Sequence, residues 1–280
     1  MPSAAVTTLN DDQTSTWRAP TTGGPRILRR ILSLDDFEAP ARRYIPRPIF
    51  GYVVSGADTN ASIRANRAAY DELAFLPKVL VGTAQRTQKT TLFGRTYDAP
   101  FGFSPMGGVS LAAYQGDLVL ARAAAQANIP MILSGAALTT LEAVREAGST
   151  AWFQAYLPGE TEPIRQLIDR VTRAGYDTLV VTVDVPVASN LEIGVRSGTD
   201  VLKALGLGAK FVFVGRPVLY AAAIAGAAGV QHAIKLLRDE IHRDMALLGI
   251  NTLDEMTQER LMEVRGYNGA PLQSRNSGAE

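Results

Sequence analysis

The fold is decided by residues 176–217, YDTLVVTVDVPVASNLEIGVRSGTDVLKALGLGAKFVFVGRP. Two short apolar runs rich in β-branched residues, 179–183 and 211–214, are too short for helices and are typical of buried strands. The stretch VLKALGLGA between them predicts a helix, with Thr199 or Asp200 as its cap and glycines at its end. A strand, a helix and a second strand make up the repeating unit of a parallel α/β sheet.

The same alternation extends from residue 100 toward the C-terminus. The predicted strands lie in FGFSPM, PMILSGA, AWFQAYL, TLVVTVDVP and FVFVG, and a helical pattern follows each of them. The last helix, 227–248, carries an apolar stripe at spacings of three and four. This order predicts a parallel sheet covered by helices, either a barrel or an open doubly wound sheet.

The residues at the strand ends favour the barrel. Polar side chains lie at or just past the C-terminal ends of the predicted strands: Ser104, Ser134, Gln154, Tyr156, Thr182 and Arg216. Barrel enzymes place their chemistry at these ends. No GxGxxG motif follows a strand, which argues against a dinucleotide-binding sheet.

The number of units is too small for a complete barrel. Eight units need about 250 residues, and residues 100–250 hold about five at that rate. We therefore predict a TIM-type (β/α) barrel that is incomplete. Helices at 33–44 and within 48–73, then a hairpin around Gly94, form a lead-in. Residues 26–267 make one domain, between a disordered tail at 1–25 and a flexible tail at 268–280.

The composition is that of an ordinary globular protein, 46% hydrophobic and 20% charged, with a net charge of +1. That balance gives no reason to expect a nucleic-acid or membrane partner. The chain has no cysteine, so disulfides, thiolate metal sites and thiol nucleophiles are excluded. No His, Asp or Glu cluster has the spacing of metal ligands. Without a signal peptide or a run of about 18 apolar residues, the expected location is the cytoplasm.

Several stretches, taken in order, resemble one known family. They are YIPRPIFGYVVSGAD, APFGFSPMGG, ILSGAALTTLEAV, WFQAYL, VVTVDVPVASNLE, VRSGTDVLKALGLGA, FVFVGRPVLYA and DEIHRDMALLGINTLDEM. In this order they are similar to the FMN-dependent 2-hydroxy-acid oxidases and dehydrogenases, the family of glycolate and lactate oxidases. The resemblance covers about residues 27–260. It implies a TIM barrel, an FMN cofactor and a small 2-hydroxy-acid substrate such as lactate or glycolate.

The resemblance also implies site residues. The positions that match flavin contacts are Pro105, Met106, Gly107, Ser134, Gln154, Thr182, Arg196, Gly215 and Arg216; among these, Gly215, Arg216 and Arg196 match the phosphate site. Tyr52 and Tyr156 match the tyrosines that contact the substrate. Taken alone, each of these residues also fits an ordinary polar or packing role.

The resemblance fails between ASNLE and GVRSGTD. The family continues there through a mobile loop and three more strands, which carry its catalytic Lys, His and Arg, and Leu191 stands where the family has another Arg. We interpret this as an internal deletion of about three βα units, joined near 190–198. The remaining histidines, His232 and His242, lie on the predicted C-terminal helix, away from the strand ends. We therefore assign no catalytic residue and expect no appreciable 2-hydroxy-acid oxidation.

Three alternatives remain. In the first two, the chain is a non-catalytic remnant that binds FMN, or one whose open sheet edges pair with another copy or with a longer relative. A phosphate-binding lyase that uses Lys78 or Lys203 ranks last, because neither lysine follows a predicted strand. The residues alone leave open whether FMN is retained.

Overall fold

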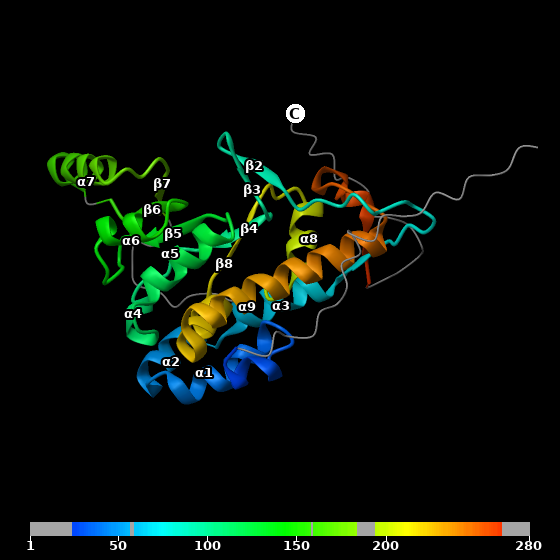
Figure 1. Ribbon diagram of the computed structural model, residues 1–280, viewed down its shortest axis with the longest axis horizontal. Coiled ribbons are helices and arrows are strands. Elements are labelled where there is room, and N and C mark those ends of the chain that lie inside the picture. The colour runs from blue at the N-terminus through cyan, green and yellow to red at the C-terminus, as the bar shows by residue number, and fades with distance from the viewer. Residues whose placement is uncertain (1–23, 57–58, 158, 184–193, 265–280) are drawn as a thin grey trace, which may run out of the picture.

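The computed structural model describes residues 24–56, 59–157, 159–183 and 194–264 (Figure 1). The predicted tail at 268–280 lies outside these ranges, as does the tail at 1–25 apart from its last two residues. Within the predicted joint, residues 190–193 lie outside them too, including Leu191.

A five-stranded parallel sheet forms the centre of the molecule. Its strands are β4 (Phe101–Phe103), β5 (Met131–Ser134), β6 (Ala151–Ala155), β7 (Leu179–Val181) and β8 (Val212–Val214), in the spatial order β7-β6-β5-β4-β8. The last of these strands in the chain, β8, therefore pairs with the first, β4, and this parallel pairing is the one that closes a barrel. Among the described residues no strand connects β7 with β8. The sheet is an incomplete barrel that is open between these two strands, as the sequence predicts.

Helices cover the outer face of the sheet. After the strands come α4 (Val109–Ala112), α5 (Gly116–Gln126), α6 (Leu141–Ala147), α7 (Thr161–Arg173), α8 (Gly198–Gly206) and α9 (Arg216–Leu248). The helix predicted at 227–248 is the second part of α9, which bends where Gly226 has a φ of 53°. One window of α9 is long and apolar enough to cross a bilayer, but 61% of it is buried, as in the core helix of a globular protein.

The helix predicted after residue 197 is present, but its cap differs from the prediction. Ser197 caps α8, because its backbone is extended and its Oγ accepts a hydrogen bond from the Asp200 backbone N–H at 3.0 Å. Thr199 and Asp200 lie inside the first turn. The expectation that one of them is the cap was wrong by two or three residues.

The N-terminal lead-in packs against α9 (Figure 1). It consists of η1 (Arg26–Arg30), η2 (Asp35–Phe37), α1 (Glu38–Tyr44), α2 (Arg47–Val54) and α3 (Ala61–Asp71). The helix predicted at 33–44 starts late because the Asp36 carboxylate accepts hydrogen bonds from the backbone N–H groups of Leu32 and Ser33. These bonds hold a turn in front of α1.

A β-hairpin covers the inner face of the sheet near the N-terminal ends of its strands. Its strands are β2 (Thr90–Leu92) and β3 (Arg95–Tyr97), and its loop residues Phe93 and Gly94 both have positive φ, as a two-residue hairpin turn requires. Tyr97 packs in an apolar cluster with Ile132 and Trp152. The hairpin predicted around Gly94 is confirmed. It fills the half-barrel at the N-terminal ends of the strands, opposite the end at which the predicted site residues lie.

The remaining elements form a small second sheet. In it, β1 (Leu73–Phe75) pairs antiparallel with β9 (Leu261–Glu263). Two short 3-10 turns, η3 (Leu253–Glu255) and η4 (Gln258–Arg260), connect the end of α9 to β9.

Candidate functional site

A cavity of about 250 Å³ lies at the C-terminal ends of β4 and β8. It is lined by Tyr52, Val53, Ser104, Pro105, Met106, Gly107, Gly194, Val195, Arg196, Phe213, Gly215, Arg216, Pro217 and Leu219. These residues come from α2, from the loop after β4, from the chain before α8 and from the start of α9. The cavity therefore brings together Tyr52 and the predicted flavin-binding residues of the first and last strands.

Two predicted glycines let the backbone approach closely in and beside this cavity. A Cβ on Gly215 would lie 2.7 Å from Ser104 Oγ, and one on Gly107 would lie 3.2 Å from Ala136 Cβ. Gly215 is also the residue before α9, so the N-terminus of that helix adjoins the cavity. Backbone N–H groups at a helix N-terminus favour a bound anion.

Two buried guanidinium groups line the same cavity. Arg196 and Arg216 are only 5% and 6% exposed. Arg216 Nη2 donates a hydrogen bond to the Ser55 carbonyl at 3.1 Å. Burial lowers the pKa of Arg216, and the nearby charge of Arg196 lowers it further. Arg196 Nη1 is buried and has no hydrogen-bond partner among the described residues.

A buried N–H donor without an acceptor is unfavourable, and a phosphate group would supply an acceptor for Arg196 Nη1. The residues present therefore fit the phosphate end of a nucleotide-type cofactor. They combine two guanidinium groups with a helix N-terminus in one small cavity.

The main chain of Arg196 is held by a carboxylate that the sequence suggested only as a possible helix cap. Asp200 Oδ2 accepts hydrogen bonds from the Arg196 backbone N–H at 2.9 Å and from Arg67 Nη1 at 2.8 Å. Asp200 is almost fully buried. The spacing of Ser197 and Asp200 resembles a capping box, and that pattern is the signal that could have revealed this role.

Three other predicted residues form a hydrogen-bonded chain across β5, β6 and β7. Ser134 Oγ donates to Gln154 Oε1 at 3.1 Å, and Gln154 Nε2 donates to Thr182 Oγ1 at 2.8 Å. Gln154 Oε1 also accepts from the Gly135 backbone N–H. These side chains point to the inner face, beside the cavity rather than in its wall, and each already has a partner inside the protein.

The predicted substrate tyrosines are both exposed, and only Tyr52 lines the cavity. Tyr156 follows β6 and lies outside the cavity wall. The structure therefore does not bring Tyr156 into the cluster that surrounds Arg196 and Arg216.

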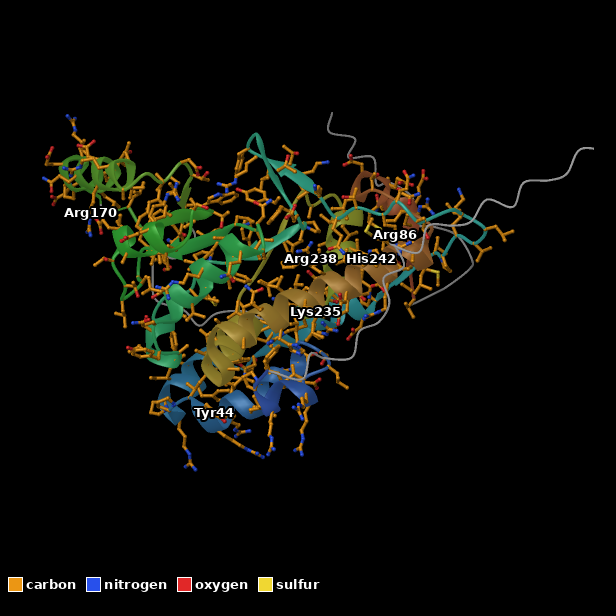
Figure 2. The ribbon with its side chains drawn as sticks, viewed as in Figure 1. Tyr44, Arg86, Arg170, Lys235, Arg238 and His242 are labelled. Carbon is orange, nitrogen blue, oxygen red and sulfur yellow. The ribbon has the colours of Figure 1, made fainter. Side chains whose placement is uncertain are left out.

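Neither histidine of the described chain reaches the cavity. His232 Nε2 is 2.8 Å from the Ile31 carbonyl oxygen. His242 lies on the second half of α9, and its Nε2 is 2.8 Å from Arg86 Nη2 (Figure 2). Of the two lysines considered for a lyase, Lys203 donates to the Tyr70 carbonyl and Lys78 lies at the surface. The cavity wall, as far as the structure describes it, contains no histidine or lysine.

Known proteins of similar sequence and structure agree with this fold and with the place of the cavity in it. A profile of the FMN-dependent dehydrogenase family matches residues 41–193 and 191–263. The L-lactate oxidase of Nostoc sp. is 25% identical over an alignment that covers 80% of this chain and 96% of that protein. Glycolate oxidase 3 of Oryza sativa subsp. indica is 24% identical, with 83% and 96% covered. The recombinant flavin-binding domain of baker's yeast flavocytochrome b2 superposes with a TM-score of 0.80 at 26% identity, with 85% and 88% covered.

This chain belongs to the FMN-dependent dehydrogenase family, and FMN is the cofactor of that family. The resemblance that the sequence suggested is confirmed. The alignment with the lactate oxidase is 351 positions long, and 80% of the 280 residues here is about 224. At about 127 positions of the alignment, the relative therefore has a residue and this chain has a gap.

Proposed function

We propose that this chain binds FMN mainly through its phosphate end and does not oxidise 2-hydroxy acids at the rate of its relatives. The proposal rests on the difference between two places at the C-terminal ends of the strands. The cavity between β4 and β8 has buried arginines, whereas the neighbouring opening between β7 and β8 has no described strand. Relatives named for lactate and glycolate support a small 2-hydroxy acid as the ancestral substrate.

The size of the cavity agrees with partial binding. Its volume of about 250 Å³ lies below the roughly 300–1,000 Å³ of sites that enclose a whole small ligand. Arg196, Arg216 and the start of α9 would hold the phosphate, while the segment 105–107 would border the rest of the cofactor. Bound FMN supplies an acceptor for the hydride equivalent that leaves a 2-hydroxy acid.

This chain has few groups that could assist such a reaction. The substrate must lose a proton to a base, and its carboxylate must be held by cations. His232 and His242 lie along α9 and are bonded elsewhere. The absence of a general base alone reduces a rate by about 10²- to 10⁴-fold, and the loss of substrate positioning adds to this.

We further propose that the chain arose by an internal deletion. The two matched segments of the family profile meet at residues 191–193, within the predicted joint at 190–198. The strand order supports a cut at the same place, because the missing neighbours would stand between β7 and β8. About 127 absent positions correspond to about four units of roughly 30 residues, one more than the three units that would complete eight.

The test combines binding with turnover. The purified full chain is titrated with FMN, and the visible absorption of the flavin is followed. Acceptor reduction is then measured with lactate, glycolate and mandelate, beside a full-length relative as the positive control. We expect saturable FMN binding and turnover at least 10⁴-fold below that of the relative. Turnover within tenfold of the relative, or no FMN binding at millimolar concentration, contradicts the proposal.

The exposure of β7 supports a second candidate function, self-association through the open edge of the sheet. Leu179 and Val181 on this strand are 39% and 41% exposed, and Val183, two residues beyond its end, is 88% exposed. The other strands of the sheet are almost fully buried. A second copy that pairs antiparallel with β7 would oppose apolar side chains to apolar side chains, with Val181 at the centre.

Self-association is tested by sedimentation of the full chain over a hundredfold range of concentration. We expect a reversible dimer that Val181→Lys converts to a monomer. The exposed and distant Leu247→Lys is the matched control and should leave the dimer intact. A wild-type chain that stays monomeric throughout this range rules out the candidate.

A further inference from the structure

Two carboxylates of the N-terminal lead-in lie near Arg196, outside the wall of the cavity. Asp35 Oδ1 lies 3.8 Å from Arg196 Nε, and Glu38 Oε2 lies 4.0 Å from Arg196 Nη2. Both distances exceed that of a hydrogen bond, so the carboxylates supply negative charge without using the N–H donors. Their side chains are 64% and 40% exposed, whereas Arg196 is buried.

The cavity needs such counter-charges while it holds no anion. Arg196 and Arg216 are both buried in its wall, and like charges in a partly desolvated place destabilise each other. The charge of Glu38 also reaches Arg216, where it opposes the effects of burial and of Arg196 on the pKa. In the same cluster, burial and the charge of Glu38 raise the pKa of Tyr220 to about 12.

The carboxylates are not needed to orient the main chain of Arg196. That role falls to Asp200, which accepts a hydrogen bond from the Arg196 backbone N–H. Asp200 is in turn bonded to Arg67. The charge of the lead-in and the placement of Arg196 can therefore be changed separately.

We infer that Asp35 and Glu38 are resident counter-anions of this cavity, which stabilise the ligand-free chain and weaken the binding of a phosphate group to Arg196 and Arg216. The inference rests on the proposed function of the cavity as a phosphate site. A phosphate monoester brings a charge of about −1.5 to −2 to this place. It satisfies the arginines directly and is repelled by both carboxylates.

Because binding free energies are reciprocal, the same competition acts on the lead-in. If the carboxylates weaken phosphate binding by some factor, bound phosphate weakens their hold on Arg196 by the same factor. Phosphate should therefore loosen η2 and α1 while it stabilises the cavity. Hydrogen exchange of the backbone amides at 35–44 reports this loosening.

The test measures affinities of the full chain for FMN, riboflavin and inorganic phosphate. Glu38→Gln and Asp35→Asn each remove one charge, and Glu146→Gln on the exposed face of α6 is the control for net charge. We expect each of the first two variants to bind FMN and phosphate about two- to fivefold more tightly, as for partly exposed ion pairs. Riboflavin, which has no phosphate, should bind unchanged. The melting temperature of both ligand-free variants should fall.

The outcomes separate this inference from the proposal on which it rests. If the wild-type chain binds FMN no better than riboflavin and binds no inorganic phosphate, the phosphate site and the inference both fail. If the wild-type chain prefers FMN while both variants bind it equally well or more weakly than wild type, only the counter-anion role is overturned. The same holds if Glu146→Gln tightens binding as much as Glu38→Gln.

Discussion

The two ends of the half-barrel sheet differ sharply. At β8 the sheet is covered by α8, which packs against α9, and α9 packs against the lead-in; the arginines beside β8 are almost fully buried. At β7 the outward side chains are exposed, and α7 packs against the core mainly through Val171 and stands at the far left of Figure 1. The side of the site suited to a phosphate group is therefore enclosed by packed elements, while the side at β7 is open among the described residues.

The same substitution made at both ends of the sheet measures how well each end is packed. Val214→Ala in β8 removes two buried methyl groups and should lower the free energy of unfolding by about 1.5–3 kcal/mol. Val181→Ala in β7 should lower it by less than about 1 kcal/mol, because that side chain is 41% exposed. Urea unfolding of both variants gives the two values. Equal losses would mean that β7 is as well packed as β8.

The arginine at the start of α9 tests the intact end. Arg216→Met keeps the apolar stem and removes the charge, and it should weaken FMN binding by about 1.5–3 kcal/mol, or roughly 10- to 150-fold. Flavin fluorescence quenching measures the affinity. Arg47→Met, which removes an exposed charge at the start of α2, serves as the control and should have little effect. An unchanged affinity in Arg216→Met would place the phosphate elsewhere.

The hydrogen-bonded chain across β5, β6 and β7 runs from the middle of the sheet to its edge at β7. Gln154→Leu leaves the Gly135 N–H and Thr182 without their present partner, so it should lower the free energy of unfolding by about 1–3 kcal/mol. Gln166→Leu on exposed α7 should change it by less than about 0.5 kcal/mol. If the two substitutions have the same effect, the chain of bonds has no structural importance.

A smaller effect should appear in the pH dependence of stability. Burial, and then the charge of Arg86, lower the pKa of His242, so the unfolded chain binds a proton more readily than the folded one. Stability from this group is complete above the ordinary histidine pKa of about 6.5 and declines as the pH falls below it. Between pH 7.5 and 5.5 the melting temperature should fall further in wild type than in His242→Gln, by about 1–2 °C. Parallel curves for the two proteins would contradict this.

Much of the fold could be predicted because its signals are local. The strands, the hairpin around Gly94 and the helix end at 248 follow from apolar periodicity, glycines and turn residues within a few positions of each other. The strand order could be anticipated only through the family resemblance. The cap at Ser197 was missed because Thr199 and Asp200 are equally good capping residues, and only the extended backbone decides between them.

Only part of the candidate site could be predicted, because only residues that are close together in the chain leave a local signal. Positions on one motif, such as 105–107 or Gly215 and Arg216, share the cavity because the chain itself keeps them together. The contacts of Arg196 with Asp35 and Glu38 join segments about 160 residues apart, and no local pattern announces them. Tyr156 follows its strand as predicted but lies outside the cavity wall, because β6 is separated by β5 from the strand β4 that borders the cavity.

The central claim is that the chain retains a place for the cofactor phosphate but has lost the chemistry at the open side of the barrel. The reduction of bound flavin under anaerobic conditions tests it most directly, because it needs no second acceptor. We predict that FMN bound to this chain keeps its visible absorption when lactate, glycolate or mandelate is added. Bleaching of the flavin band within the time that a full-length relative needs would contradict the account.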